Sequence, residues 1–311
     1  MPKTIILTLS FLLFSLFSFS QKKQICITID DLPVVSYGIT DIQYQTKLTA
    51  DLLAHLKQKK IPAIGFVNEM KLFPDDNYSE DQVELLKMWL NAGQELGNHT
   101  FAHKDYNNTP FKEYAEGIVK GEKITKKLLE ESGKKMEYFR HPFLHLGPTK
   151  EKADSLSTFL FEHGYTVAPV SIDNDDYLFA LAYHRLLAKN DKETATKLAE
   201  DYLKYMEEKL LFYERQSEKL FERNITQILL LHANKLNADF LGKLADVYLK
   251  HGYEFVSIEK ALEDPAYQTP ITKYGRYGIS WLDRWALSAG KTGDFFKGDP
   301  ESAEYVKQLA K

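Results

Sequence analysis

The sequence has a single cysteine, Cys26, and therefore cannot form an intramolecular disulfide bond. Stability must come from a hydrophobic core, and 311 residues with 44% hydrophobic side chains are ample for one large α/β domain or two small ones. This composition also argues against a disordered chain. Cys26 lies within an apolar run, residues 25–29, and is expected to be a small buried side chain rather than a nucleophile.

The sequence also lacks an apolar run long enough for a comfortable membrane span. Residues 4–20 form an apolar stretch behind Lys3 that is short for a span and ends in Ser-Phe-Ser. We interpret residues 1–20 as a signal peptide, cleaved near Ser20 and Gln21. The mature protein would then be exported, either periplasmic or secreted, without stable membrane insertion. The alternative interpretation is an uncleaved N-terminal anchor.

There is no excess of positive charge either. The chain has 40 basic and 44 acidic residues, and loss of Lys3 with the signal peptide leaves a net charge near −5. No basic stripe is interleaved with aromatic residues, so nucleic acid is excluded as an expected partner. Internal repeats and low-complexity linkers are absent as well. The oligomeric state is left open.

Short apolar strands alternate with amphipathic helical patterns, which is typical of βα units around a parallel sheet or barrel. The predicted strands are 25–29, 63–67, 94–97, 136–139, 166–170, 225–231 and 253–256. The predicted helices are 42–57, one around 83–89, 111–131, 149–163, 239–250 and one from Ser257. Two long helical patterns over 177–223 indicate a helical hairpin, and a last helix is predicted from 299–300.

Two aspartates and two histidines give the strongest chemical signal. Asp30 and Asp31 follow the first predicted strand, and His99 and His103 follow the third. Two neutral imidazoles and one carboxylate can hold a divalent metal and leave one position open for water or substrate. Histidines four residues apart on a helical turn point to one side, and this donor set suits zinc, with cobalt, nickel or manganese as alternatives. The second carboxylate is then available as a base.

Five segments in order resemble the polysaccharide deacetylases, carbohydrate esterase family 4 with the NodB-like fold. The resemblance extends over roughly residues 25–262 and implies an irregular (β/α)7-type barrel. The segments are 28–33 (TIDDLP), 99–103 (HTFAH), 140–143 (RHPF), 173–177 (DNDDY) and 230–232 (LLH). The expected organisation is a signal peptide at 1–20, a deacetylase domain at 21–264 with a helical insertion at about 177–223, and a helical C-terminal extension at 265–311 packed on the domain.

The resemblance implies an exported, metal-dependent hydrolase that removes N- or O-acetyl groups from a poly- or oligosaccharide. In such an enzyme Asp31, His99 and His103 would be the metal ligands and Asp30 the general base. Arg140 would orient Asp30 and keep it ionised, as a bidentate fork can.

By the same resemblance, His232 would be the general acid, supported by a carboxylate of the acidic loop. We favour Asp176 over Asp173 for that support and interpret Asp175 as a solvated turn residue. The oxyanion would be shared between the metal and a backbone N–H near Phe143. The remaining expected substrate contacts are Pro142 and Tyr177.

The chain departs from the family pattern at Leu32, where the first motif normally has glycine, and at Tyr177, where tryptophan is common. Leu32 implies a different local backbone or a narrower cleft floor. The helical insertion would roof the cleft. His141 and His145 flank the third motif but are expected to support the site or lie at the surface, because three ligands suffice.

Two rival functions are open. One is a metal-dependent hydrolase of a non-sugar amide, like the allantoinase-like relatives of this fold. The other is a carbohydrate-binding protein on a catalytically disabled scaffold, against which the retained Asp30 and His232 argue, because a binder needs neither.

Overall fold

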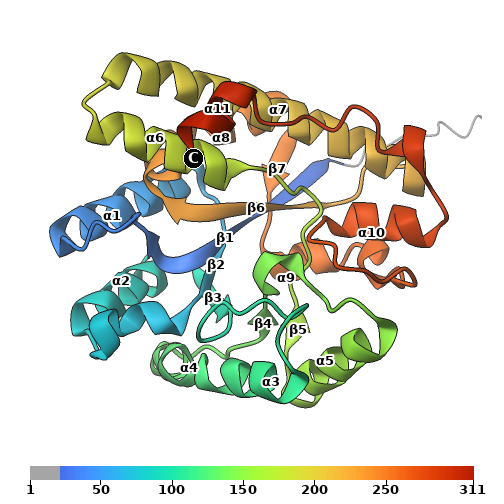
Figure 1. Cartoon of the computed structure of the whole chain (residues 1–311), viewed down its shortest axis with the longest axis horizontal. Coiled ribbons are helices and arrows are strands. Elements are labelled where there is room, and N and C mark those ends of the chain that lie inside the picture. Colours follow the sequence, from blue (N-terminus) through green and yellow to red (C-terminus); the bar gives the residue numbers. More distant parts are fainter. Residues whose placement is uncertain (1–21) are drawn as a thin grey trace, which may run out of the picture.

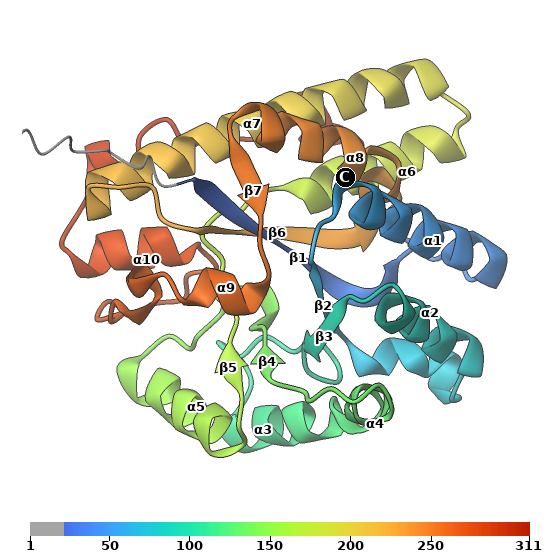
Figure 2. The same cartoon turned by 180° about the vertical axis from the view of Figure 1, so that it is seen from behind.

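The computed structural model describes residues 22–311, so the predicted signal peptide lies outside the described residues. A curled sheet of parallel strands forms its centre, with helices around the outside (Figures 1 and 2). The strands are β1 (Lys23–Val35), β2 (Ile64–Val67), β3 (Glu95–Asn98), β4 (Tyr138–Phe139), β5 (Thr166–Val167), β6 (Gln227–Asn234) and β7 (Tyr253–Phe255). The helices are α1 (Ile42–Lys59), α2 (Glu80–Asn91), α3 (Phe111–Lys120), α4 (Lys123–Glu131), α5 (Lys150–Glu162), α6 (Asp176–Ala188), α7 (Lys192–Phe221), α8 (Lys235–Lys250), α9 (Ile258–Leu262), α10 (Trp281–Ser288) and α11 (Glu304–Leu309).

The sheet curls into an irregular barrel. Its strand order is β5-β4-β3-β2-β1-β6, and β7 pairs with the beginning of β1. Beyond β5, a single bridge between Ile172 and Leu229 joins the chain to β6 at the other edge. The predicted α/β fold of the (β/α)7 type is therefore confirmed. Since all strand pairs are parallel, the carboxyl ends of the strands lie at one edge, where ligands bind in such folds.

The first strand is longer than predicted. It runs to Val35 rather than ending at Ile29, so Asp30 and Asp31 lie within it. In its pairing with β6, Asp30 is the neighbour of His232. Neighbouring parallel strands lie about 4.8 Å apart, so this register brings two distant motifs together.

The predicted helix over 111–131 is wrong, because the structure has α3 and α4 with a break at Gly121. A Cβ atom at Gly121 would lie 2.4 Å from the backbone of Thr100 and Phe101. Glycine is needed here because the helix end packs directly on the loop that carries His99 and His103.

Two further predicted helix starts are corrected. The eighth helix begins at Lys235 rather than Asp239, with Asn234 as its N-cap. The last helix begins at Glu304 rather than at 299–300. Asp299, which precedes this last helix, accepts a hydrogen bond from Lys209 in α7.

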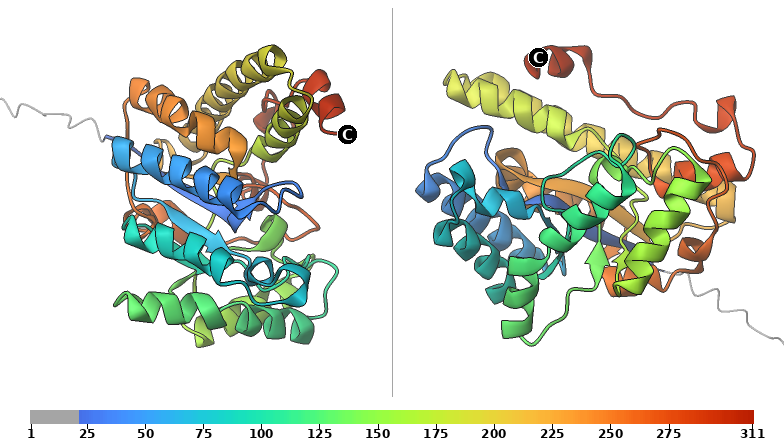
Figure 3. Two further views of the ribbon diagram at one scale, coloured as in Figure 1. Left: turned by 90° about the vertical axis from the view of Figure 1, so that its left-hand side faces the viewer. Right: turned by 60° about the horizontal axis from the view of Figure 1, so that its bottom comes forward.

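The predicted hairpin corresponds to α6 and α7, which lie along one side of the barrel with α8 (Figure 3). Asp191 caps α7. Four of the residues that α7 packs against the rest of the protein are Leu198, Tyr202, Tyr205 and Tyr213, all of them buried. After α9, the chain continues through α10 and α11, which pack near α7 and α6 (Figure 1). The division of the chain into domains stays a prediction.

Cys26 is fully buried in the core, and burial raises the pKa of its thiol to about 12, so it is a structural side chain. Between residues 22 and 311, no helix is both long and apolar enough to cross a bilayer.

Leu32 is also fully buried, and it fits against a glycine on the neighbouring strand. A Cβ atom at Gly65 would lie 2.1 Å from Leu32 Cδ1. The expected narrower cleft floor is not observed, because Leu32 points into the core and is not among the residues that line the cavity.

We therefore expect Gly65→Ala to lower the free energy of unfolding by about 1–3 kcal/mol, because it overpacks the core at Leu32. In the double variant Gly65→Ala/Leu32→Ala the new methyl group occupies space that Leu32 vacates. Its loss of unfolding free energy should therefore be about 1 kcal/mol smaller than the sum of the losses in the two single variants. Denaturant unfolding measures both. Gly117→Ala is the control, because a Cβ atom there meets nothing within 4 Å and lies on a helix. Strict additivity would contradict the packing argument.

Candidate active site

Asp30 and Asp31 reach the same cavity because the backbone turns between them. Asp31 has a left-handed conformation, with φ of 67°, which aspartate tolerates better than most residues. Consecutive side chains of a regular strand point to opposite faces, so this turn is what brings both carboxylates to one side. The Lys71 ammonium fixes the turn by donating to the carbonyls of Asp31 (2.6 Å) and Val34 (3.2 Å).

His99 and His103 lie on an irregular loop, so the predicted helical turn is wrong. Thr100 and His103 have positive φ values of 66° and 49°. Side chains hold this loop: Asn98 Oδ1 accepts from the Thr100 N–H at 2.7 Å, and Thr100 Oγ1 accepts from the His103 N–H at 3.0 Å. The loop conformation, rather than helical spacing, turns the two imidazoles toward Asp31.

Asp31, His99 and His103 form a group that fits a metal ion. Asp31 Oδ1 lies 3.8 Å from His99 Nε2 and 3.6 Å from His103 Nε2, and one ligand atom from each residue lies within 4.8 Å of the others. Ligands of a tetrahedral zinc ion with bonds of about 2.1 Å are about 3.4 Å apart. Asp31 Oδ1 is buried without a hydrogen-bond partner within residues 22–311, and a cation would compensate it.

The protonation states of these residues agree with a ligand role. His99 Nδ1 lies 2.9 Å from the Arg140 carbonyl, so Nδ1–H donates there and the Nε2 lone pair faces Asp31. Burial lowers the pKa of His99 well below its ordinary value and also lowers the pKa of His103. Burial acts to raise the pKa of Asp31, but the Lys71 ammonium and the adjacent histidines outweigh it and the pKa is lowered. Two neutral imidazoles and a carboxylate result.

Asp30 is buried beside this group, and Arg140 lies behind it. Arg140 Nη1 is 3.6 Å from Asp30 Oδ2, while Arg140 Nη2 donates to Thr28 Oγ1 at 2.8 Å. The predicted bidentate fork is therefore not formed. Burial raises the pKa of Asp30 to about 6 against the opposing charge of Arg140. A carboxyl group with this pKa is largely ionised at neutral pH and still basic enough to accept a proton.

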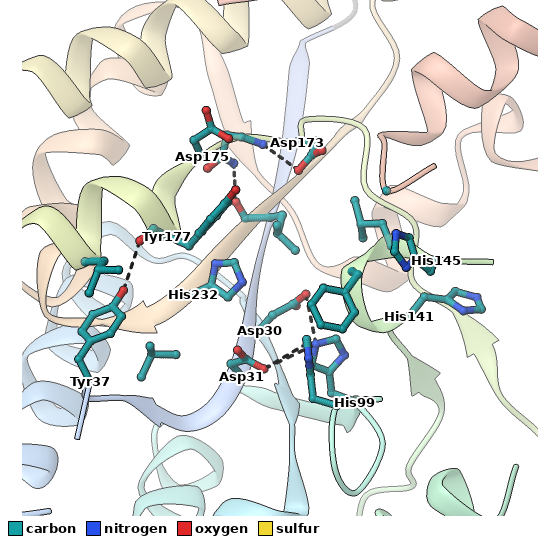
Figure 4. Close-up of a pocket in the computed structure, with 18 residues that line it drawn as sticks. Asp30, Asp31, Tyr37, His99, His141, His145, Asp173, Asp175, Tyr177 and His232 are labelled. Atoms are coloured by element: carbon teal, nitrogen blue, oxygen red, sulfur yellow. Dashed lines mark hydrogen bonds and ion pairs between the residues drawn. The ribbon is translucent and has the colours of Figure 1, made fainter. Parts of the chain in front are cut away.

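His232 faces the carboxylates from β6 and is held by Asp176, the first residue of α6. Asp176 Oδ1 accepts from His232 Nδ1 at 2.6 Å, and Oδ2 accepts from the His232 N–H at 2.9 Å. Asn237 also donates to Asp176, at 2.9 Å. Burial acts to lower the pKa of His232, but the charge and hydrogen bond of Asp176 outweigh it and raise the pKa to about 9. In Figure 4, His232 lies on one side of Asp30 and Asp31, and His99 on the other.

The other two aspartates of the acidic loop have different surroundings. Asp175, expected to be a solvated turn residue, is partly buried and accepts from Ser302 Oγ at 2.5 Å. Its own N–H donates to the Tyr205 hydroxyl. Asp175 thus connects the loop to the C-terminal extension. Asp173 accepts from the N–H of Asn174, and burial raises the pKa of its carboxyl to about 7.

These groups share a cavity of about 690 Å³. Phe143 and Tyr177 line it and are about half exposed, at 52% and 51%. The Phe143 ring packs edge-on against His103, with ring centroids 4.5 Å apart. Pro142 is buried and is not among the lining residues, so the expected substrate contact is not supported. The roofing role expected of the insertion is limited to α6, which contributes Tyr177 and Leu181 to the lining.

His141 and His145 also line the cavity. His145 Nδ1 lies 2.6 Å from Asp105 Oδ1, so its orientation is fixed by the loop that follows His103. His141 is only 4% exposed, and burial lowers its pKa to about 3. Neither residue belongs to the candidate metal group.

Sequence reasoning missed several contributors to this site. Lys71 lies outside the five motifs, so the sequence did not indicate its contact with Asp31. Thr28 lies in the first motif but carries no charge, so its contact with Arg140 was not expected either. Tyr37 lines the cavity from the loop after β1, and Gly278 lines it from the C-terminal extension. Asn237 is three residues after the N-cap Asn234, and this pairing could have indicated a constrained helix start.

A comparison with protein families matches residues 19–159 to the model described as Polysaccharide deacetylase. Among curated proteins, no match was found. Among solved structures, the peptidoglycan deacetylase PdaC from Bacillus subtilis has 20% sequence identity and a TM-score of 0.49, with 78% of this chain and 91% of that chain covered.

Two other structural matches have similar values. A family 4 carbohydrate esterase from Bacillus anthracis has 21% identity and a TM-score of 0.47, covering 78% of this chain and 83% of that one. BA3943, described as a CE4 family pseudoenzyme from Bacillus anthracis, has 16% identity and a TM-score of 0.47, covering 78% and 66%.

The first three motifs lie within the matched range, and the last two lie beyond it. The resemblance to the polysaccharide deacetylases is thus confirmed, with residues 19–159 as the part of the chain that matches the family model.

Proposed function

We propose that the protein is an exported, metal-dependent deacetylase that hydrolyses N- or O-acetyl groups of a poly- or oligosaccharide. The observation that carries this proposal is the position of Asp30, which lies between the candidate metal group and His232 (Figure 4). A base and an acid on the two sides of one reacting centre are what hydrolysis of an amide or ester requires.

The residues divide the chemistry as follows. A divalent metal held by Asp31, His99 and His103, with zinc as the first candidate, would supply a Lewis acid and lower the pKa of water. Asp30 accepts the proton of the attacking water, and the buried Arg140 holds positive charge behind Asp30 as it does so.

The remaining steps use the other wall of the cavity. Attack of water on the acetyl carbonyl produces an oxyanion, which accepts a hydrogen bond from the Phe143 N–H. This N–H lies at the start of a 3-10 turn, where N–H groups have no acceptor within the turn. His232, protonated and oriented by Asp176, donates its Nε2 proton to the leaving amine or alkoxide. Acetate and a free amine or hydroxyl group are the products.

Two features of the site support a catalyst over a binding protein on a disabled scaffold. Burying Asp30 and the Asp176–His232 pair costs free energy that sugar binding does not require. Export is supported by the predicted signal peptide at residues 1–20, and the acetylated substrate by the family match.

Replacing Asp30 tests the proposal directly. Asp30→Asn removes the base and should lower acetate release at least about 100-fold, as expected for loss of general base catalysis. Acetate release is measured on acetylated chitooligosaccharides, peptidoglycan fragments and acetylxylan, with the metal-stripped protein as a second inactive form. Asp51→Asn, at a partly exposed position of α1 outside the cavity, is the matched control and should retain full activity. An active Asp30→Asn protein would refute the assigned role, and release from a non-sugar amide alone would favour the rival hydrolase.

The metal group predicts one tightly bound divalent ion per chain. His103→Ala removes one of three ligands and should weaken zinc binding at least about 100-fold, because two ligands cannot complete the site. Isothermal titration of the metal-free protein with zinc measures this without substrate. His145→Ala is the control, because His145 lines the same cavity but lies outside the group. Equal loss of affinity in both variants would argue against the assigned ligands.

The pH profile tests the Asp176–His232 pair. Asp176 raises the pKa of His232, and a general acid must be protonated to act. In Asp176→Asn the pKa of His232 falls, so the alkaline limb of the kcat/KM profile should move to lower pH, and kcat should decrease. Asp175→Asn removes a neighbouring carboxylate that bonds to Ser302 rather than to His232 and should leave the limb in place. An unchanged limb in Asp176→Asn would exclude His232 as the acid.

A further inference from the structure

The turn that follows Arg140 has an unusual backbone. Phe143 and Leu144 are consecutive residues with positive φ, 56° and 54°, although neither is glycine. Such conformations are unfavourable for side chains of this size and persist where surrounding contacts impose them. Phe143 lines the cavity, and its ring packs against His103, so whatever imposes this turn also sets the shape of the cavity.

A buried arginine from the C-terminal extension contacts this turn. Arg284, in α10, is only 1% exposed, and its Nη2 donates to the carbonyl of Leu144 at 2.7 Å and to the carbonyl of Tyr277 at 2.6 Å. Within residues 22–311 the Arg284 Nε is buried without a hydrogen-bond partner, and the Asp283 and Asp173 carboxylates act on the guanidinium only through their charge. Burying a guanidinium group without a carboxylate partner is costly. The guanidinium also lies over the Trp281 ring, 5.7 Å from its centroid, and its hydrogen bonds join one carbonyl on the turn to one on the extension.

Gly278 brings the extension into direct contact with the same turn. A Cβ atom at Gly278 would lie 2.6 Å from the Phe143 carbonyl oxygen and 3.1 Å from His145 Nε2. Gly278 itself lines the cavity. The absence of a side chain therefore allows the extension to pack on the turn and form part of the cavity wall.

The extension is attached to the barrel on either side of these contacts. The Trp281 N–H donates to the Val170 carbonyl at 2.7 Å, just after β5. Further along, Ser302 donates to Asp175 in the acidic loop. Arg284 thus connects the turn to a segment that is itself fixed to the sheet.

We propose that residues 277–284, which we name the C-terminal wall, hold the Phe143–Leu144 turn in its active conformation, with Arg284 as the positioning residue. Arg284 touches no reacting atom and acts through the Leu144 carbonyl. The effect on the rate rests on the proposed function, because the Phe143 N–H is assigned there to the oxyanion. The effect on the turn itself does not.

Steady-state kinetics on an acetylated chitooligosaccharide tests the rate effect. Arg284→Met keeps the bulk but removes both hydrogen bonds, and should lower kcat about 10- to 100-fold with KM within about threefold, because a displaced oxyanion donor affects the transition state more than substrate binding. The kcat of Arg284→Lys should be at least about threefold higher than that of Arg284→Met, since a single nitrogen of Arg284 makes both hydrogen bonds and the lysine ammonium can replace it. Gly278→Ala should lower kcat as Arg284→Met does, by displacing the Phe143 carbonyl.

Arg223→Met is the matched control. Arg223 pairs with Asp264 before the start of β6, whereas His232 lies near the other end of this strand. Loss of the Arg223–Asp264 pair therefore destabilises the protein without changing a contact of the turn. This variant should keep kcat within about twofold of the unmodified protein. If Arg284→Met also kept kcat within twofold, or if Arg223→Met lost as much, the positioning role would be overturned.

Hydrogen–deuterium exchange of the metal-loaded protein separates this proposal from the proposed function. Amides of residues 141–147 should exchange at least about tenfold faster in Arg284→Met than in the unmodified protein or in Arg223→Met. Unchanged exchange would overturn the wall's role, even in an active enzyme. If the unmodified protein released no acetate from any substrate, the proposed function would fail, and faster exchange would still support the wall.

Discussion

Two neighbouring carboxylates, Asp30 and Asp31, enter one buried cavity, and charge repulsion between them governs how the site is built. Adjacent ionised carboxylates in a poorly hydrated site require compensating positive charge. Lys71 lies on the backbone side of Asp31, and Arg140 reaches Asp30 only at 3.6 Å. This partial compensation leaves Asp31 Oδ1 without a partner among the described residues, and a divalent cation on that side would complete the balance.

A second charge pair faces the first across the cavity. Asp176 is fully buried, and its two oxygens accept hydrogen bonds from the ring and from the backbone N–H of His232. Asp176 is the first residue of α6. Its charge and hydrogen bond raise the pKa of His232 to about 9, so the imidazole is protonated near neutral pH. Under the proposed function the two carboxylate systems would differ in role: Asp31 would bind the metal, and Asp176 would keep the proton on His232 that is transferred to the leaving group.

The sequence predicted the parts of this arrangement that depend on local pattern. Strand ends and helix periodicity indicated the parallel barrel, and the family motifs placed Asp30, Asp31, His99, His103 and His232 near one edge of the sheet. Of the three aspartates in the acidic loop, the structure pairs Asp176, the one favoured from the sequence, with His232; its catalytic role stays a prediction. Parallel pairing explains why the residues at the strand ends lie together, because the ends of neighbouring strands meet whatever their distance along the chain.

Errors arose where distant backbone segments meet closely. The helix over 111–131 is broken because Gly121 packs on the loop of the histidines, and the loop itself is held by Asn98 and Thr100 rather than by helical spacing. The fork expected between Arg140 and Asp30 is absent because Thr28 takes one guanidinium nitrogen. The contacts of Gly121 and Thr28 join segments that are distant in the sequence, and no local pattern encodes their approach. The hydrogen bonds of Asn98 and Thr100 are local, but they are made by side chains and leave no periodic pattern.

The departure at Leu32 and the C-terminal wall share one physical basis. In each case a glycine elsewhere in the chain makes room for a bulky or main-chain group near the site: Gly65 for Leu32, and Gly278 for the Phe143 carbonyl. The family match ends at residue 159, yet the cavity includes residues from 173 to 278. The matched range contains the candidate metal ligands and Asp30, whereas part of the cavity wall comes from residues beyond it. The shape of the cavity therefore depends on packing contacts of Gly65 and Gly278 as well as on the motif residues.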